Sequence, residues 1–177
     1  MTCPGGPLVK TYVGRRDSTT PAPNGLLPDV NAPAAELYQL FQDKGFNAVD
    51  LAALLGAHST SNQFNFNTSS AAVGLPQDST PGVWDVKYYS ETLTPPKGVV
   101  VFPSDSKLAA HSTVGKEFKG FVNNQGKWTG KFADAMGRMT LFGSDGTKGL
   151  IDCTSALPGT TSLKREMKVM PLFAPRD

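Results

Sequence analysis

The sequence predicts a mainly α-helical fold with about five helices, long ordered loops and little sheet. Apolar residues recur at helical spacing in several segments, and one of these, Asn47–His58, is apolar nearly all round, as in a buried helix. Gly (18 residues) and Pro (14 residues) cluster between the helical segments. Because both residues interrupt regular structure, their placement indicates short helices held by long loops.

The five expected helices are spread over the whole chain. In order they are 31–44, 47–58, a short helix after Asp85 that continues to about Thr92, 114–122 and 127–142. The first has Pro33 in its first turn and Gly45 as its stop, and the fourth has Thr113 as a possible cap. The last carries an apolar face and ends before Gly143. That face is made of Trp128, Phe132, Met136 and Met139.

The 47–58 helix is the element around which the others are expected to pack. Asn47 can cap its start, and Asp50 three residues later suits both a capping box and the positive end of the helix dipole. His58 stands at its end. A lone histidine on an apolar helix is usually a core residue with one satisfied nitrogen, and the alternative is a metal or cofactor ligand.

The remaining segments are predicted to be irregular. A short strand can form over 8–13, and 99–102 is a buried strand or an extended run closed by Pro103, Ser104 and Asp105. Residues 60–81 lack periodicity, and a loop this long usually needs something to order it. We expect one domain over 1–157 and a surface tail over 158–177.

Composition excludes several function classes. The net charge is +2 without a basic cluster, so nothing points to nucleic acid. No apolar run has membrane-spanning length, and the start of the chain does not read as a signal peptide. No serine occupies a GxSxG elbow, which disfavours a nucleophilic triad.

Oxygen donors are closely spaced around the Pro81-Gly82 turn. Asp78, Thr80, Val83 and Asp85 could form a calcium site with Ser59 as a further contributor, because calcium takes 6–8 oxygen ligands. The alternative is an Asx-type turn followed by a helix cap, without an ion.

Asp105 is the acid most suited to pair with His58. It follows an apolar run, and a buried carboxylate needs a partner. A carboxylate on Nδ1–H of a ligating imidazole fixes its tautomer and makes it more electron-donating. The alternative is an ordinary aspartate in a Pro-Ser-Asp-Ser turn.

Several motifs resemble those of the fungal class II secretory haem peroxidases of the plant-type superfamily. They are Cys3–Pro7, Val13–Asp17, Leu54–Ser59, Leu75–Asp85, Phe102–Asp105, Phe121–Gln125 and Leu150–Cys153. Their order and spacing match the C-terminal, proximal half of these enzymes, from about Cys3 to Pro158. The resemblance therefore implies the proximal half of the plant-type haem peroxidase fold.

The resemblance also implies roles for individual residues. His58 matches the axial ligand of the haem b iron, Asp105 the carboxylate that orients it, and Pro28 a position near the haem edge. The matches to the proximal calcium ligands are Ser59, Asp78, Thr80, Val83 and Asp85. The expected activity is oxidation of small aromatic donors by hydrogen peroxide, in a secreted protein.

Departures from the family pattern refine this expectation. The distal histidine and arginine of the family match no residue here, so we expect a truncated chain with little turnover of its own, the missing distal half being a possible partner. Alternatively, it is an inactive product or a calcium-stabilised helical module without haem turnover.

Other departures concern the cysteines and the substrate. Cys3 and Cys153 match cysteines whose family disulfide partners lie in that distal half, although pairing with each other stays open. Ala53 replaces a surface tryptophan of lignin-type members. By the same resemblance, Asn62 and Phe64 match positions that approach the haem propionates, and Phe64 stands where manganese-oxidising members carry an acid.

Overall fold

The computed structural model describes residues 6–16 and 18–157, and within them the chain is mainly helical, which confirms the predicted fold class. Six α-helices are present in this part of the chain, against the five expected. They are α1 (Ala34–Gln42), α2 (Ala48–Leu55), α3 (Lys87–Leu93), α4 (Pro103–Ala110), α5 (Val114–Lys119) and α6 (Gln125–Thr140). Two 3-10 helices, η1 (Gly56–Thr60) and η2 (Thr154–Ala156), and a sheet of β1 (Tyr12–Val13) and β2 (Ile151–Asp152) complete the structure. The expected tail, 158–177, lies outside the described residues.

Helix α2 begins with the capping box that the sequence predicts. The Asn47 side chain accepts hydrogen bonds from the backbone N–H groups of Val49 and Asp50, and the Asp50 carboxylate accepts one from the Asn47 N–H. Three backbone N–H groups at the start of the helix, which have no intrahelical acceptor, are thereby paired. Asp50 also forms an ion pair with Arg138, which ties the start of α2 to α6.

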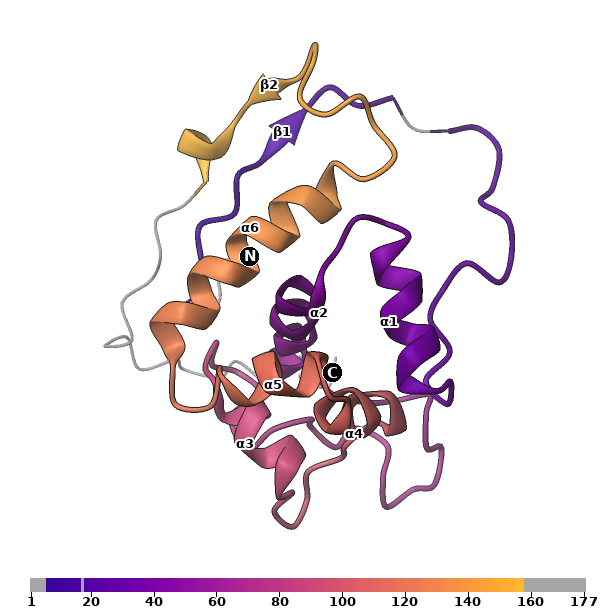
Figure 1. The fold of residues 1–177 in the computed structure, drawn as a ribbon, viewed down its shortest axis with the longest axis vertical. Coiled ribbons are helices and arrows are strands. Elements are labelled where there is room, and N and C mark those ends of the chain that lie inside the picture. Colours follow the sequence, from indigo (N-terminus) through magenta and orange to yellow (C-terminus); the bar gives the residue numbers. More distant parts are fainter. Residues whose placement is uncertain (1–5, 17, 158–177) are drawn as a thin grey trace, which may run out of the picture.

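Helix α2 lies at the centre of the fold, with the other helices arranged around it (Figure 1). It packs mainly against α6 and α5, while α4 packs against α5 and α1. Leu51, Ala52 and Ala53 are almost completely buried, as the all-round apolar pattern predicts. None of the helices in the described ranges combines the length and apolar character needed to cross a membrane.

An aromatic cluster fills the space between α2, α3, α5 and α6. Trp84 stacks on Trp128 with ring centroids 4.5 Å apart, and Phe132 packs edge-on against Trp84. The Trp128 indole donates a hydrogen bond to the Ala53 carbonyl at 3.0 Å, and the Tyr89 hydroxyl donates one to the Ala52 carbonyl at 2.9 Å. These side chains bond to carbonyls in the last part of α2 and so tie the end of this helix to the aromatic cluster.

Helix α4 is not among the five expected helices, because Pro103 is as compatible with the end of a strand as with the start of a helix. Residues 99–102 are partly buried and form no strand, so the expected buried strand is absent there. Phe102 has an extended backbone, and Pro103 then begins α4 instead of closing a turn. Proline is well suited to the first turn of a helix, since its missing N–H would be unpaired there anyway. Asp105 consequently lies in a helical first turn.

Two further expectations are corrected by the structure, one by a contact between distant segments and one by a local contact. Of the strand expected over 8–13, only Tyr12–Val13 (β1) forms, and β1 pairs antiparallel with β2 from the other end of the described chain. Thr113 makes no side-chain capping bond at the start of α5. Instead, the His111 ring nitrogen Nδ1 accepts from the Thr113 and Val114 N–H groups at 3.3 Å.

The 60–81 loop is ordered by its own polar contacts. The buried Gln63 side chain bonds the backbone of Asn67 in both directions and also donates to the Ala72 carbonyl. The Gln63 N–H bonds the Leu75 carbonyl, and Asn62 forms an isolated bridge with Pro76. The loop therefore returns beside the residues that follow His58.

We predict that Gly56→Ala destabilises the fold. A Cβ atom at Gly56 would overlap the Trp128 indole and the Tyr89 hydroxyl, both of which are fixed by hydrogen bonds. Overpacking of this kind typically costs about 1–3 kcal/mol. Denaturant unfolding should show a lower midpoint for this variant. Gly130→Ala in α6, where the added atom meets nothing within 4 Å, should leave the midpoint unchanged or raise it.

Candidate functional site

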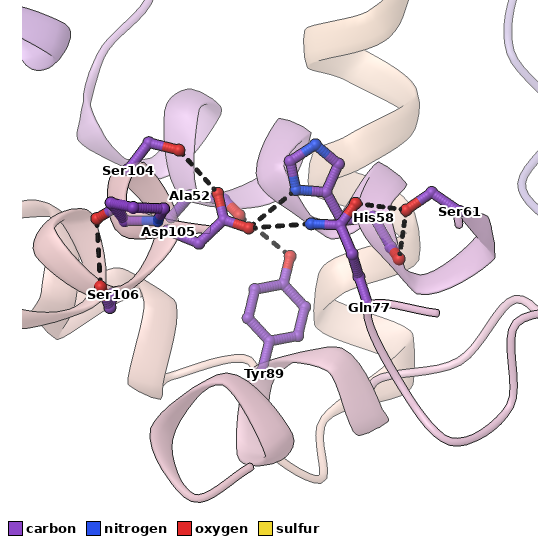
Figure 2. Close-up of polar contacts among 9 residues, drawn as sticks. Ala52, His58, Ser61, Gln77, Tyr89, Ser104, Asp105 and Ser106 are labelled. Atoms are coloured by element: carbon purple, nitrogen blue, oxygen red, sulfur yellow. Dashed lines mark hydrogen bonds and ion pairs between the residues drawn. The ribbon is translucent and has the colours of Figure 1, made fainter. Parts of the chain in front are cut away.

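His58 lies in a 3-10 turn that continues from α2. The sequence pattern predicts a helix through His58, but α2 ends at Leu55 and η1 carries the histidine. The side chain is 31% exposed, so the ring is neither buried in the core nor directed fully into solvent. Figure 2 shows one ring nitrogen directed at Asp105 and the other pointing away from it.

The structure brings His58 and Asp105 together, although 47 positions separate them in the sequence. Nδ1 of His58 and Oδ2 of Asp105 are 3.0 Å apart (Figure 2). Asp105 is fully buried in the first turn of α4, where the helix dipole favours a negative charge. A carboxylate at Nδ1 favours the tautomer with the proton on that nitrogen, which leaves Nε2 with a free lone pair.

Aromatic rings enclose the imidazole on two sides. Tyr88 and Phe102 each pack edge-on against His58 with centroid separations of 5.7 Å. Tyr88 is buried, and burial, followed by the negative charge of Asp105, raises the pKa of its phenol well above the ordinary value of 10.0. The phenol therefore stays neutral beside the carboxylate.

Gln77 also contacts Asp105, and the sequence interpretation assigned it no role. Its side-chain nitrogen Nε2 donates to Asp105 Oδ2 at 3.2 Å, and its Oε1 accepts from the Ser61 hydroxyl at 2.6 Å. The Ser61 hydroxyl also lies 3.0 Å from the His58 carbonyl oxygen (Figure 2). A pattern of residue types could not reveal this, because Gln77 stands in a run whose other residues suggested an ion site.

A largely apolar cavity of about 410 Å³ opens beside His58. Its lining includes the exposed Pro28, which the resemblance had placed near a haem edge. His58 and Asp105 supply polar groups to the lining. Most of the other lining residues are apolar side chains from α1, α2, α4 and α6, namely Leu37, Phe41, Leu51, Leu54, Leu55, Leu108, Met136 and Met139. The cavity thus combines apolar walls with few polar groups, as ligand sites do.

Some of the candidate ligand oxygens around the Pro81-Gly82 turn hydrogen-bond to one another, and others lack a hydrogen-bond partner among the described residues. Thr80 donates its hydroxyl to Asp85 Oδ2 and its N–H to Asp78 Oδ1, both at 2.8 Å, and the Val83 N–H bonds the Thr80 carbonyl. The Asx-type turn is thus present at Asp78. Ser59 Oγ and Asp78 Oδ2 are nevertheless buried without a hydrogen-bond partner among the described residues.

The carboxyl group of Asp78 carries a perturbed pKa. Burial, reinforced by the nearby charges of Asp85 and Glu91, raises the pKa of Asp78 from 3.8 to about 6, against the opposing effect of the Thr80 N–H. A buried carboxylate without a cation is costly, so the site favours a bound proton or a bound metal. No set of three His, Cys, Asp or Glu side chains is placed for a metal within the described ranges, so a hard cation here would depend on hydroxyl and backbone oxygens as well.

The positions at which the sequence departs from the family pattern lie in different environments. Ala53 is fully buried beneath Trp128, so the expected surface position is not at the surface of this chain. Phe64 is 58% exposed, and the Asn62 side chain donates to the Gly74 carbonyl. Cys153 follows β2 and is partly buried, while Cys3 lies outside the described residues.

Comparison with known proteins gives consistent matches. A family model described as peroxidase matches residues 1–124. The low-redox potential peroxidase of Taiwanofungus camphoratus is 33% identical, over 88% of this chain and 51% of the relative. Manganese peroxidase 3 of Phlebia radiata is 31% identical, over 92% of this chain and 49% of the relative. Ligninase B of Phanerodontia chrysosporium is 30% identical, over 88% of this chain and 46% of the relative.

The chain spans about half the length of the curated relatives it matches. The family model nevertheless covers well over half of the chain itself. These relatives are fungal and are named as peroxidases or ligninases. The chain therefore belongs to the peroxidase family, within the fungal class II peroxidases.

Proposed function

We propose that this chain forms the haem-binding face of a peroxidase, with His58 as the axial ligand of the iron. The observation that supports it best is the pairing of His58 Nδ1 with the buried Asp105 carboxylate beside an apolar cavity. This donor set fits a haem, because a porphyrin needs apolar walls and its iron needs one neutral imidazole nitrogen.

The roles of the two residues follow from their geometry. Bound haem would supply iron redox chemistry with hydrogen peroxide as the oxidant. Asp105 accepts the hydrogen bond from Nδ1, which keeps the Nε2 lone pair available and makes the imidazole more electron-donating. Such a ligand stabilises higher oxidation states of iron and so suits peroxide chemistry.

Peroxide activation also needs a group that transfers a proton. The chain has two histidines, of which His58 is engaged by Asp105 and His111 accepts hydrogen bonds from the first N–H groups of α5. We therefore assign to this chain the holding of the cofactor, and assign proton transfer to a distal partner outside this sequence. The reductants that we propose are small aromatic donors, in a secreted enzyme.

Specialised reductants are disfavoured by two positions. Phe64 provides no carboxylate for manganese, and Ala53 is buried and not redox-active. Manganese and lignin chemistry in the names of relatives is accordingly not carried over to this chain.

Calcium is the second proposed ligand. Ser59 and Asp78 offer buried oxygens that have no partner among the described residues, and Thr80, Val83 and Asp85 would complete the set. An ion held there would steady Ser59 and so the adjacent His58. The same unsatisfied oxygens favour the alternative function, a calcium-stabilised helical module without haem turnover.

Haemin titration tests the haem proposal. We expect the full chain to shift the Soret band of haemin, and His58→Ala to abolish that shift because the axial nitrogen is lost. Asp105→Asn should weaken binding roughly 10- to 100-fold, as is typical when a hydrogen-bond partner of a metal ligand is removed.

His111→Ala is the matched control, since it removes the other histidine but leaves the cavity intact. Its titration should resemble that of the unaltered chain. An unaltered chain that leaves the Soret band unchanged would reject the haem proposal and favour the calcium-stabilised module.

Calcium binding should couple to the protonation of Asp78. Because its pKa is about 6 in the folded chain and ordinarily 3.8, the folded chain holds this proton more tightly than the unfolded chain. Without calcium, the resulting stabilisation, on the order of 2 kcal/mol, is complete below about pH 4 and is lost as the pH rises through about 6. Calcium should therefore raise the melting temperature more at neutral pH than in acid.

Melting curves of Asp78→Asn check this coupling, since this variant should lose both the pH effect and the calcium effect. Asp145→Asn, which alters an exposed aspartate, should keep both. Equal responses of the two variants to calcium would contradict the assignment of Asp78.

A further inference from the structure

Gln77 is a buried polar side chain that the proposed function does not use. It is 2% exposed and lies in the part of the 60–81 loop that returns to the site. Both ends of its amide group are engaged, by the Asp105 carboxylate and by the Ser61 hydroxyl. A buried amide fully engaged in this way has a fixed orientation, because releasing either end would leave a polar group unpaired.

The contact with Asp105 matters because Gln77 bonds the same carboxylate oxygen that pairs with His58. Oδ2 accepts from Gln77 Nε2 at 3.2 Å and is the same atom that lies 3.0 Å from His58 Nδ1. The other carboxylate oxygen, Oδ1, has a longer contact of 3.4 Å with the Ser104 hydroxyl. The negative charge that His58 meets is thus shared with a second donor.

We propose that Gln77 is a positioning residue that limits how strongly Asp105 draws the Nδ1 proton of His58. A donor that stabilises the carboxylate charge weakens the attraction of the same oxygen for a neighbouring proton. Gln77 thereby sets the electron donation available at Nε2. The inference deepens the proposed function and rests on it for its meaning in the haem-loaded protein.

The network also connects this effect to the main chain at His58. The Ser61 hydroxyl contacts both the Gln77 side-chain oxygen and the His58 carbonyl, and the Gln77 N–H bonds the Ser61 carbonyl at 3.2 Å. Gln77 is consequently held relative to the turn that carries the histidine. A movement of the loop would change the hydrogen bond from Gln77 to Asp105 Oδ2, and with it the strength of the hydrogen bond between that oxygen and His58 Nδ1.

The test compares two buried glutamines of the same loop. Gln77→Met keeps the length of the side chain and removes the donor to Asp105. Gln63→Met is the matched control, because Gln63 is 3% exposed and bonds loop backbone but none of its hydrogen bonds reaches Asp105. Ser61→Ala is a milder variant that loosens the Gln77 amide with little change in packing.

The first measurement uses the haem-free chain, so that it does not depend on cofactor binding. The His58 Nδ1–H proton resonance should move downfield in Gln77→Met, since a hydrogen bond no longer shared is stronger, and should move less in the same direction in Ser61→Ala. It should not move in Gln63→Met. An unchanged or upfield resonance in Gln77→Met, or in Ser61→Ala should Gln77→Met not fold, would overturn the proposal, as would an equal shift in Gln63→Met.

The second measurement uses the haem-loaded chain. The iron–histidine stretching frequency of the ferrous protein should rise in Gln77→Met and the midpoint potential should become more negative, because the imidazole donates more strongly. Changes in the opposite direction would overturn the inference. If the unaltered chain takes up no haem, the proposed function fails, whereas the proton resonance still decides the role of Gln77.

Discussion

A buried carboxylate beside a histidine is the constraint on which the rest of the site depends. Asp105 is fully buried, and a charge in that position is tolerated only with partners. The structure provides them from three segments, namely His58 from η1, Gln77 from the returning loop and the first turn of α4. Each partner also fixes a chain segment, so the electrostatic requirement of one side chain organises the surroundings of the imidazole.

The core supplies the rigidity that this arrangement needs. Helix α2 is held at its start by the capping box and Arg138, and near its end by the Tyr89 and Trp128 hydrogen bonds. The turn with His58 follows directly from that end. Because the preceding helix cannot shift without breaking these contacts, the imidazole is positioned by the aromatic core as well as by its own hydrogen bond.

The second group of polar residues lies next to the first along the chain. Ser59 follows His58, and Asp78 follows Gln77. In each pair the first residue belongs to the histidine network, and the second contributes a buried oxygen that lacks a partner within residues 6–16 and 18–157. A cation bound by Ser59 and Asp78 would therefore hold both chain segments that position the imidazole. This adjacency gives a physical reason why ion binding and cofactor binding would depend on each other.

Much of the local structure was predictable from the sequence, because helix patterns and caps depend on neighbouring residues. The apolar run of α2, its Asn47 cap and the face of α6 are all of this kind. Motif resemblance, confirmed at the level of the family, also pointed to His58 and Asp105 as partners. The start of α4 was missed because a proline can equally end a strand or begin a helix.

What only the tertiary structure decided involves contacts between residues far apart in the sequence. The pairing of β1 with β2, the burial of Ala53 beneath Trp128 and the contact of Gln77 with Asp105 arise from segments that no local pattern relates. The sequence by itself determined which hydrogen bonds each side chain is able to make, because that capacity depends only on the residue type. Which partner it meets depends on packing, since only the folded chain brings the two groups within hydrogen-bonding distance.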